Sequence, residues 1–511
     1  MTATVVAISP DRFNHRKLIA SAAGLVALVF LAHGLSLWGT FIWDDLDLIV
    51  RSPLIHASDG LWRFWFTTQA PDYFPLTSTT WWIEWRLWGN HSAGYHLINL
   101  LLHAASAVLI WRILVELKLP NAWLAAAIWA VHPVQVESVA WIAERKNTLS
   151  VALAAGSMLL LLRFHYSNRR STYIWALTLF TTALLAKTAV APLPVVMMAC
   201  ALWKGRGIRR ALLETIPFAA ITIALSSITI YFQTQRAIAT DVVRADGLAS
   251  RIAIAGRAVW FYIGKLIWPT PLDFVYPRWT TGDVSPHVFA PLLLFILTFI
   301  VLWLGRRNWG WGPLLAMAYF LLMLLPVLGL LNIYFMRYSL VADHWQYVAS
   351  IGPIALFAWA LSRTKPRFQW AVGIAVVVGL TVLSQRQAWL YRSGESLWND
   401  TIAKNPTSWM AQMNLGHTYA FEKRYREAEA QYRAAAARVP DLAEPHYSIG
   451  SIDAQQGRFA DAVMEYQQAI DRNPNVAAIY LDMAHALAEI NRPTEAKQAY
   501  ERAMQLERAG H

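Results

Sequence analysis

The chain has 511 residues, of which 56% are hydrophobic and only 15% are charged. Soluble domains carry about 25% charged residues, so this composition excludes an ordinary soluble enzyme. The net charge is +12, and the excess of Lys and Arg lies in residues 1–385, between apolar stretches. Such a distribution is typical of membrane-orientation signals and predicts no nucleic-acid partner. The single cysteine, Cys200, excludes an internal disulfide.

Apolar stretches recur through the first three quarters of the chain and predict an all-α fold with a polytopic helical membrane domain over 1–385. A helix needs about 20 apolar residues to cross a hydrocarbon core of about 30 Å. The 26 Trp residues support a membrane domain, because Trp gathers at membrane interfaces. About eleven spans are predicted, at 18–38, 94–114, 121–141, 148–165, 172–186, 190–203, 211–232, 288–305, 312–331, 345–361 and 368–385.

Basic residues alternate between loops and predict the orientation. Arg12, Arg16 and Lys17 precede the first span, and every second loop after it is basic, which places these segments in the cytoplasm. With an odd number of spans, the C-terminal region then lies on the outer side. A cleaved signal peptide is the alternative for 18–38, but its apolar run is long and no small-x-small cleavage site follows. The basic loops contain Arg163, Arg169, Arg170, Lys204, Arg206, Arg209, Arg210, Arg306, Arg307, Arg363, Lys365 and Arg367.

The C-terminal region repeats with a period of 34 residues. Gly416 and Tyr432 recur as Gly450 and Tyr466, and a third, degenerate copy follows. This period is typical of tetratricopeptide repeats, in which each helical hairpin buries its apolar face against its neighbours. We predict a linker and half repeat over 386–408 and an α-solenoid of three repeats over 409–511. Its concave surface suits extended peptides, and an oligomerisation module is the alternative.

The first outer loop, 39–93, opens with two adjacent carboxylates, Asp44 and Asp45. Like charges this close raise one pKa, which suits a general base, and paired carboxylates also bind cations. A solvated loop start is the simpler alternative. The rest of the loop is rich in Trp and Phe and predicts amphipathic helices in the membrane interface.

Further polar residues lie at the outer ends of the second to fourth spans, where ionisable groups often mark function. His96, Asn99 and His103 are spaced for one helix face, which favours a polar-lined cavity. His132 and the following proline predict a helix break near the outer surface. Glu137 lies two helical turns before Glu144, so the two carboxylates share a face if the helix continues.

Cations also lie on the predicted outer side, against the general charge bias. Arg145, Lys146, Lys187 and Arg337 can hold a phosphate, and Asp343 and His344 extend the polar set. A salt-bridged turn is the alternative for the first two. Segment 236–287 is predicted to lie wholly outside with one interfacial helix, and a double crossing is its alternative. A carboxylate that accepts a hydroxyl proton, beside cations that stabilise a departing phosphate, suits a lipid-linked phosphosugar donor.

These motifs resemble a known family. The Asp-Asp pair after the first span resembles the acidic first-loop motif of GT-C glycosyltransferases. The segments 95–103, 132–141 and 144–147 resemble the transmembrane-and-tetratricopeptide-repeat O-mannosyltransferases and their bacterial relatives. The order of parts, with the membrane domain first and the repeats last, is also similar. One departure is Phe74, where relatives often carry Arg before the Pro-Leu pair.

The resemblance implies transfer of a sugar, typically mannose, from a polyprenyl-phosphate carrier to Ser or Thr of an exported polypeptide, with inversion at the anomeric carbon. It makes Asp44 or Asp45 the base, with Glu137 as a supporting carboxylate. Arg145, Lys146 and Lys187 become candidates for holding the donor phosphate. The expected partners are the lipid-linked sugar, an acceptor polypeptide bound by the repeats, and the bilayer. The expected location is a bacterial inner membrane, with the N-terminus cytoplasmic and the repeats periplasmic, and an endoplasmic reticulum membrane with the repeats in the lumen is the alternative.

Two other functions are compatible with the sequence. A non-catalytic scaffold would recruit partners through its repeats, but it needs no acidic and basic cluster on one side. A flippase or transporter of a lipid-linked sugar needs polar groups through the whole membrane depth, whereas here they gather near the outer face. We expect no metal requirement, because Lys and Arg can stabilise a single phosphate, although Mg²⁺ or Mn²⁺ held by the paired carboxylates is the alternative.

Overall fold

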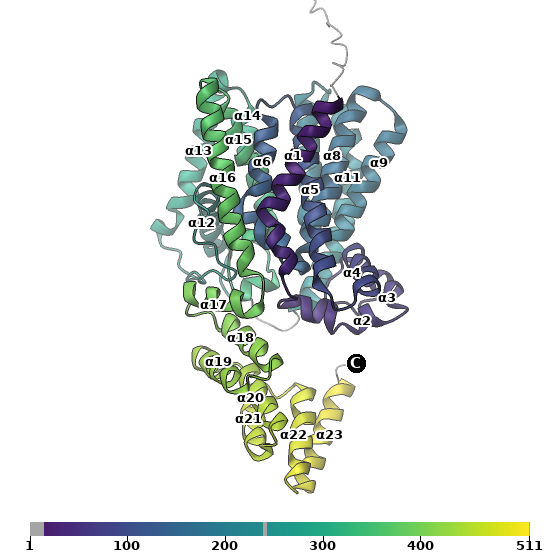
Figure 1. Ribbon diagram of the computed structural model, residues 1–511, viewed down its shortest axis with the longest axis vertical. Coiled ribbons are helices and arrows are strands. Elements are labelled where there is room, and N and C mark those ends of the chain that lie inside the picture. The colour runs from purple at the N-terminus through teal and green to yellow at the C-terminus, as the bar shows by residue number, and fades with distance from the viewer. Residues whose placement is uncertain (1–14, 239–242, 510–511) are drawn as a thin grey trace, which may run out of the picture. The chain divides into compact units, whose positions relative to one another are not determined.

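The computed structural model describes residues 15–238 and 243–509, and within these ranges the regular structure is helical (Figure 1). Arg12, which contributes to the predicted orientation signal, lies outside the described residues. The chain divides into two compact units. The membrane unit comprises the chain up to Phe274 together with Arg278–Arg392, and the repeat unit comprises Val275–Pro277 together with the chain from Ser393.

A helix overlaps every stretch predicted to span the membrane. Not all of these helices are long and apolar enough to cross. In the described ranges six qualify by length and composition, four more are apolar but shorter, and α9 is in neither group, so the predicted number of about eleven spans is not confirmed. The helices are α1 (His15–His33), α5 (Ser92–Glu116), α6 (Ala122–Val131), α8 (Arg145–Ser167), α9 (Arg170–Ala186), α10 (Leu193–Trp203), α11 (Ile208–Phe232), α13 (Ala290–Trp309), α14 (Gly312–Leu324), α15 (Ile351–Leu361) and α16 (Pro366–Leu390).

The predicted break at His132 is confirmed. α6 ends at Val131, and two short turns of helix, η3 (Pro133–Gln135) and α7 (Val136–Ala140), follow before η4 (Ile142–Glu144). Proline cannot donate the backbone hydrogen bond that would continue α6. The condition under which Glu137 and Glu144 would share one helix face is therefore not met, because α7 ends between them.

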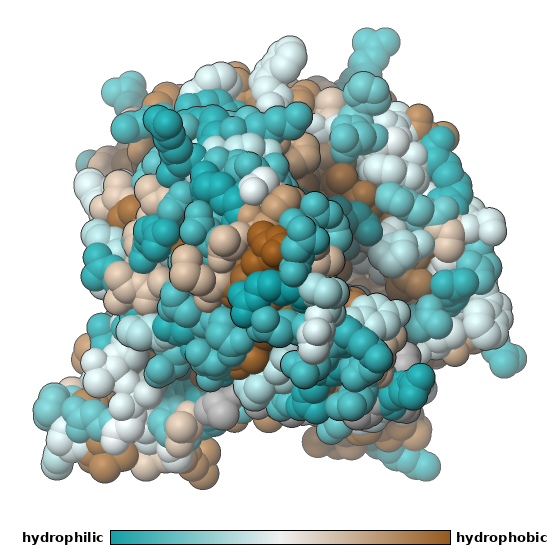
Figure 2. Space-filling view, turned by 90° about the horizontal axis from the view of Figure 1, so that it is seen from below, coloured by the Kyte–Doolittle hydropathy of each residue, from teal (hydrophilic) through white to brown (hydrophobic). Residues whose placement is uncertain are grey.

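The two ends of the membrane unit differ in charge. α1 ends where α5 and α8 begin, and we call this the acidic end, since Asp44 and Glu144 lie there. α5, α10 and α13 end at the opposite end, which we call the basic end because Lys118, Lys204 and Arg306 lie there. In Figure 1 the acidic end is the lower end of this unit and the basic end is the upper. Figure 2 shows the whole molecule from below, where the surface facing the viewer is mostly hydrophilic with hydrophobic patches between.

The first loop folds over the acidic end as short helices, α2 (Pro53–His56), α3 (Gly60–Phe66) and α4 (Pro75–Trp88). They enclose a small apolar core that includes Ile55, Phe64 and Trp81. Burial of such large side chains stabilises the loop by about 1.5–3 kcal/mol each relative to exposure. The loop is therefore a fixed platform on which the carboxylates before it can be held.

No candidate span lies between Ile238 and Pro286 in the described part of this segment, which excludes 239–242. It contains α12 (Leu248–Ile267), which has an apolar face of Ile254, Val259 and Tyr262 buried against the unit. An interfacial helix was predicted here, and the side of the membrane on which it lies stays a prediction.

The repeat unit consists of one leading helix and three helical hairpins. Gly416 and Gly450 show why the period contains small residues: an added Cβ would lie 2.4 Å from the ring of Tyr432 at the first and 2.7 Å from the ring of Tyr466 at the second. Only glycine allows this close packing. The helices are α17 (Gly394–Lys404), α18 (Trp409–Phe421), α19 (Tyr425–Arg438), α20 (Glu444–Gln455), α21 (Phe459–Arg472), α22 (Ala477–Glu489) and α23 (Pro493–Ala509).

Candidate active site

The Asp-Asp pair lies in a tight turn between α1 and the loop helices. The preceding residue, Trp43, has a left-handed backbone (φ 44°), which is costly for a bulky residue. Its indole stacks on Trp141 with ring centroids 5.3 Å apart and also contacts Phe274 and Phe335. This aromatic packing offsets the backbone cost and fixes the direction in which Asp44 and Asp45 leave the turn.

Asp45 is fully buried, and both of its carboxylate oxygens are occupied. Oδ2 accepts a hydrogen bond from the backbone N–H of Ile42 at 3.0 Å, and Oδ1 accepts one from Ala143 at 2.6 Å. Burial raises the pKa of Asp45 to about 8, while these two hydrogen bonds lower it. Asp45 therefore ties the first loop to the turn before α8 and has no free oxygen for a substrate.

Asp44 has the opposite environment. It is only half-buried, and within the described ranges no hydrogen bond to its carboxylate is found. Burial raises its pKa to about 6, the nearby Lys146 lowers it, and Asp72, Asp47 and Glu144 raise it again. A carboxylate with a pKa near 6 is a stronger base than an ordinary aspartate and is still ionised at neutral pH. The sequence could not distinguish Asp44 from Asp45. In the structure, Asp45 is anchored by hydrogen bonds and Asp44 is available.

Lys146 and Glu144 lie near Asp44, and Lys187 joins them through Glu144. Lys187 Nζ donates to both oxygens of Glu144, at 3.2 and 3.0 Å, and Lys146 Nζ lies 4.0 Å from Glu144 Oε1. The Glu144 side chain is 2% exposed, whereas those of Lys146 and Lys187 are 12% and 19% exposed. The lysines are therefore held in place from the buried side and still reach the surface. Lys187 follows α9 directly, because the helix ends at Ala186 ahead of the prolines that begin α10.

Asp72 is a member of this cluster that sequence reasoning missed. It influences the ionisation of Asp44, and its Oδ1 accepts a hydrogen bond of 2.7 Å from Gln233. It lies two residues before Phe74, within the loop motif where relatives often carry Arg. That departure from the motif was the only signal in the sequence that could have drawn attention to it.

Arg145 is separated from the lysines by its partners. It is fully buried, pairs with Glu84 of α4, bonds the side-chain oxygen of Asn99, and donates to the carbonyl of Tyr95 at 2.7 Å. Breaking such a buried pair is strongly destabilising, because one charge is left uncompensated. With its donors engaged inside the unit, Arg145 is not placed to hold a phosphate, contrary to its predicted role.

The three polar residues of α5 are buried and do not line an open cavity. Asn99 donates to the carbonyls of Val139 and Trp141 at 3.3 and 3.2 Å, so it supports the turn before α8. His103 bonds the hydroxyl of Tyr347 at 2.7 Å and the carbonyl of Ala130 at 3.0 Å. His96 is 1% exposed and packs against Gly39, where an added Cβ would lie 2.8 Å from its Nε2.

Of the remaining candidate residues, most are buried and hydrogen-bonded inside the unit, and Arg337 is half-buried. Glu137 accepts from the backbone N–H of His344 at 2.8 Å and pairs with its Nδ1 at 2.9 Å, and all of these groups are buried. His132 bonds the carbonyl of Leu266 at 3.0 Å, which fixes the helix break. Asp343 is buried beside His344, and Arg337 is half-buried at the end of η9 (Tyr334–Arg337).

No group of three or more His, Cys, Asp or Glu side chains is arranged to hold a metal ion within 15–238 and 243–509. The absence of a metal requirement stays a prediction. The cluster members that reach the surface are two carboxylates, Asp44 and Asp72, and two ammonium groups, Lys146 and Lys187. Asp72 accepts a hydrogen bond from Gln233, whereas Asp44 has no hydrogen-bond partner among the described residues. Such a set can take up a proton and stabilise an oxyanion on neighbouring atoms.

Comparisons with known proteins match both units. Residues 71–232 match the family described as dolichyl-phosphate-mannose-protein mannosyltransferase, and residues 411–440 and 453–509 match tetratricopeptide repeats. Among solved structures, a crystal structure of MamA matches with a TM-score of 0.23 and 19% identity, over 25% of this chain and 78% of that one.

Two curated relatives match across most of the chain. A protein O-mannosyl-transferase of Caenorhabditis elegans is 22% identical over 80% of this chain and 61% of its own length. The human protein O-mannosyl-transferase TMTC3 is 24% identical over 79% of this chain and 50% of its own length. The chain thus spans about half to three fifths of the length of these relatives. The chain is thus similar, in its membrane domain and its repeats, to the transmembrane protein O-mannosyltransferases.

Proposed function

We propose that the protein is a membrane glycosyltransferase that moves mannose or another hexose from a polyprenyl-phosphate donor to a hydroxyl group of an exported polypeptide. The observation that supports this most directly is the half-buried Asp44 near Lys146, with Lys187 paired to the neighbouring Glu144 at the acidic end. The homologues named protein O-mannosyl-transferases support the same activity.

The reaction that fits this cluster balances as a single displacement. The acceptor hydroxyl oxygen forms a bond to the anomeric carbon, and the bond from that carbon to the donor phosphate breaks. Asp44 accepts the hydroxyl proton. The leaving polyprenyl phosphate gains the negative charge, which Lys146 and Lys187 stabilise electrostatically. Attack on the face opposite the leaving group inverts the anomeric carbon, as the family resemblance implies.

Asp45, Glu137 and His344 act as positioning residues in this proposal. Asp45 holds the first loop against the turn before α8, so it sets the distance between Asp44 and the helix that carries Lys146. The pair of Glu137 and His344 holds the segment before α15 against α7. Both carboxylates are buried and accept hydrogen bonds from the protein, so neither is exposed to a substrate hydroxyl.

The repeats would capture the acceptor polypeptide. Stacked helical hairpins present an extended concave surface that suits unfolded segments. We place the protein in a bacterial inner membrane, with the N-terminus in the cytoplasm and the acidic end and repeats on the outer side. The donor's prenyl tail would then stay in the bilayer while its phosphate reaches the lysines.

A non-catalytic scaffold is the second candidate, and the repeat unit is the observation that favours it. A scaffold predicts that neutralising Asp44 has no effect on glycans. Glycan mass spectrometry on exported proteins therefore separates the two functions. It should compare strains with the intact gene, a deletion, Asp44→Asn, and the control Asp47→Asn.

Asp47 is a matched control because it lies three residues away, its side chain is 75% exposed, and it pairs only with Arg51 in the described part of the chain. We expect loss of a hexose from defined peptides in the deletion and in Asp44→Asn, and retention in Asp47→Asn. Unchanged glycans in all strains, with the protein present in the membrane, would overturn the transferase proposal in favour of the scaffold.

A further inference from the structure

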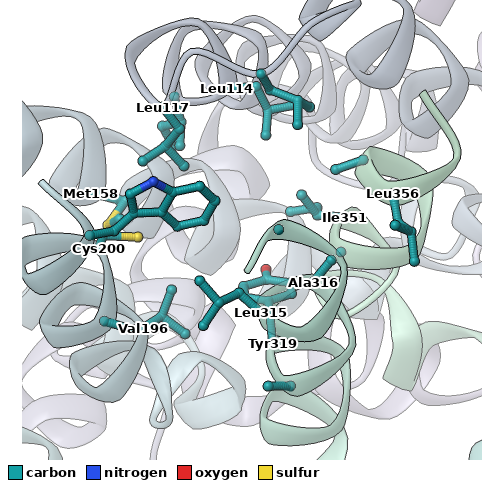
Figure 3. Close-up of a pocket in the computed structure, with 18 of the residues that line it drawn as sticks. Leu114, Leu117, Met158, Val196, Cys200, Leu315, Ala316, Tyr319, Ile351 and Leu356 are labelled. Carbon is teal, nitrogen blue, oxygen red and sulfur yellow. The ribbon is translucent and has the colours of Figure 1, made fainter. Parts of the chain in front are cut away.

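The membrane unit contains a large apolar cavity away from the acidic cluster. Its volume is about 520 Å³, and it lies between α5, α8 and α10 on one side and α14 and α15 on the other. In Figure 3, side chains such as Leu114, Met158, Leu315 and Leu356 surround an open space. A space of this size lined by hydrocarbon groups suits an apolar ligand of tens of atoms.

The mouth of the cavity lies at the basic end. Lys118 and Pro120 line it just beyond the end of α5, and Trp203, Trp309 and Trp311 line it at the ends of α10 and α13 and the start of α14. Trp side chains gather at the level of lipid headgroups. The guanidinium of Arg306 lies 4.0 Å from the Trp303 ring centroid and 5.7 Å from that of Trp311, so a second cation is close to the mouth.

The depth of the cavity matches one leaflet. Along α14 the lining runs from Gly312 to Met323, which at 1.5 Å per residue is roughly 17 Å. Half of a hydrocarbon core of about 30 Å is close to this length. The inner end is lined by Val151, Val190 and Val348.

We propose that this cavity holds an acyl chain of an anionic phospholipid from the leaflet at the basic end. The chain fills the apolar space, the Trp side chains lie at the glycerol level, and Lys118 with Arg306 attracts the phosphate. Cations near the membrane surface favour anionic over neutral headgroups. The site is separate from the cluster at Asp44, and its mouth opens at the opposite end of the unit.

Occupancy also supports the helices of the candidate active site. Val151 lies on α8 shortly after Lys146, and Val190 follows Lys187 closely. An acyl chain packed against both would restrain the two helix segments from which the lysines project. An empty cavity would lack those packing contacts, since an unfilled space leaves its lining without partner atoms.

The test uses the full chain in nanodiscs of equimolar phosphatidylcholine and phosphatidylglycerol. A trace of phosphatidylglycerol with a photoactivatable acyl chain is crosslinked, and the modified residues are mapped by mass spectrometry. We expect crosslinks on cavity-lining residues such as Cys200 and Leu315. Ala199→Phe, which fills part of the cavity, should lower their yield at least several-fold. The matched control is Ala224→Phe, at an exposed position of α11 outside the lining.

The headgroup is tested by competition between the two lipids. Lys118→Gln should reduce the preference for phosphatidylglycerol while acyl-chain capture persists, and Lys17→Gln, an exposed lysine at the same end, should leave it unchanged. Equal crosslinking in Ala199→Phe and Ala224→Phe, spread over the outer helix faces, would overturn the proposal. Polyprenyl phosphate that displaces the crosslinked lipid more strongly than phosphatidylglycerol would overturn it in favour of the prenyl chain.

A second measurement uses the unaltered chain, so it does not depend on whether a variant folds. Cys200 is the sole cysteine of the chain and lines the cavity. Its alkylation by N-ethylmaleimide in detergent should slow several-fold when phosphatidylglycerol is added, and less when phosphatidylcholine is added. A rate that neither lipid changes would contradict occupancy of the cavity.

Discussion

The two ends of the membrane unit both contain a carboxylate among cations, but the charges are balanced differently. At the basic end Glu214 accepts from Arg210 at 2.9 Å and lies 3.8 Å from Arg206 and 3.3 Å from His165. At the acidic end Glu144 is paired with Lys187, while Asp44 has no hydrogen-bond partner among the described residues.

In the proposed function, this difference separates a structural carboxylate, Glu214, from the proposed base, Asp44. Glu214 lies among Arg210, Arg206 and His165, so it fastens the ends of α8, α10 and α11 together. Asp44 is held at the edge of a buried cluster where its basicity is raised and its oxygens stay available. Perturbed pKa values with a specific charged neighbour are typical of functional sites. Four predictions test the contrast.

The largest effect is expected for Asp44→Asn. An amide cannot accept the hydroxyl proton, and general-base catalysis contributes about 10²–10⁴-fold, so hexose transfer should fall by that factor. Transfer from a radiolabelled polyprenyl-phosphate hexose to an acceptor peptide measures it. The thermal stability in detergent should stay unchanged, and Asp47→Asn should keep full activity. If Asp44→Asn transferred the hexose at the wild-type rate, Asp44 would not be the base.

Asp45→Asn should act on stability as well as on activity. One backbone N–H would face the new amide hydrogens, and leaving a buried donor without its acceptor costs about 1–3 kcal/mol. We expect a lower midpoint of thermal unfolding together with slower transfer. A variant with normal stability and abolished transfer would instead make Asp45 the base and contradict the division of roles between the two carboxylates.

Glu214→Gln should affect stability and leave chemistry unchanged. The variant loses its partly exposed ion pairs with Arg206 and Arg210, and exposed pairs are worth about 0.2–1 kcal/mol each. We expect a small decrease in the unfolding midpoint and an unaltered transfer rate once the amount of folded protein is matched. A large loss of transfer per folded molecule would show that the basic end takes part in the reaction.

The smallest effect is a shift in pH dependence. Asp44 must be ionised to act as the base, so transfer should rise with pH through about 6 and level off above it. Lys146 lowers the pKa of Asp44, so Lys146→Gln should raise that pKa and move the rise to higher pH. The profile of kcat/KM measures the shift, with Lys17→Gln as the control. If Lys146→Gln did not change the pH at which kcat/KM rises, Lys146 would have no effect on the pKa of Asp44.

The sequence by itself determined the class of the molecule. Hydrophobic stretches must cross or pack in a bilayer whatever their partners, and the glycines at 416 and 450 recur because each hairpin repeats the same local packing. The break at His132 was also predictable, since Pro133 excludes the next helical hydrogen bond locally. These features depend on residues close in sequence, and pattern and period reveal them.

Only the tertiary structure decided the roles of the polar residues. Asp44 and Asp45 are adjacent and chemically identical, yet the backbone N–H of Ala143 donates a hydrogen bond to Asp45 and not to Asp44. Arg145 is removed from the predicted phosphate site by Glu84, and Glu137 is paired with His344, far away in the chain. Burial and hydrogen-bond partners set whether a charged group is anchored or available, and in this protein the partners come from distant segments that no local pattern specifies.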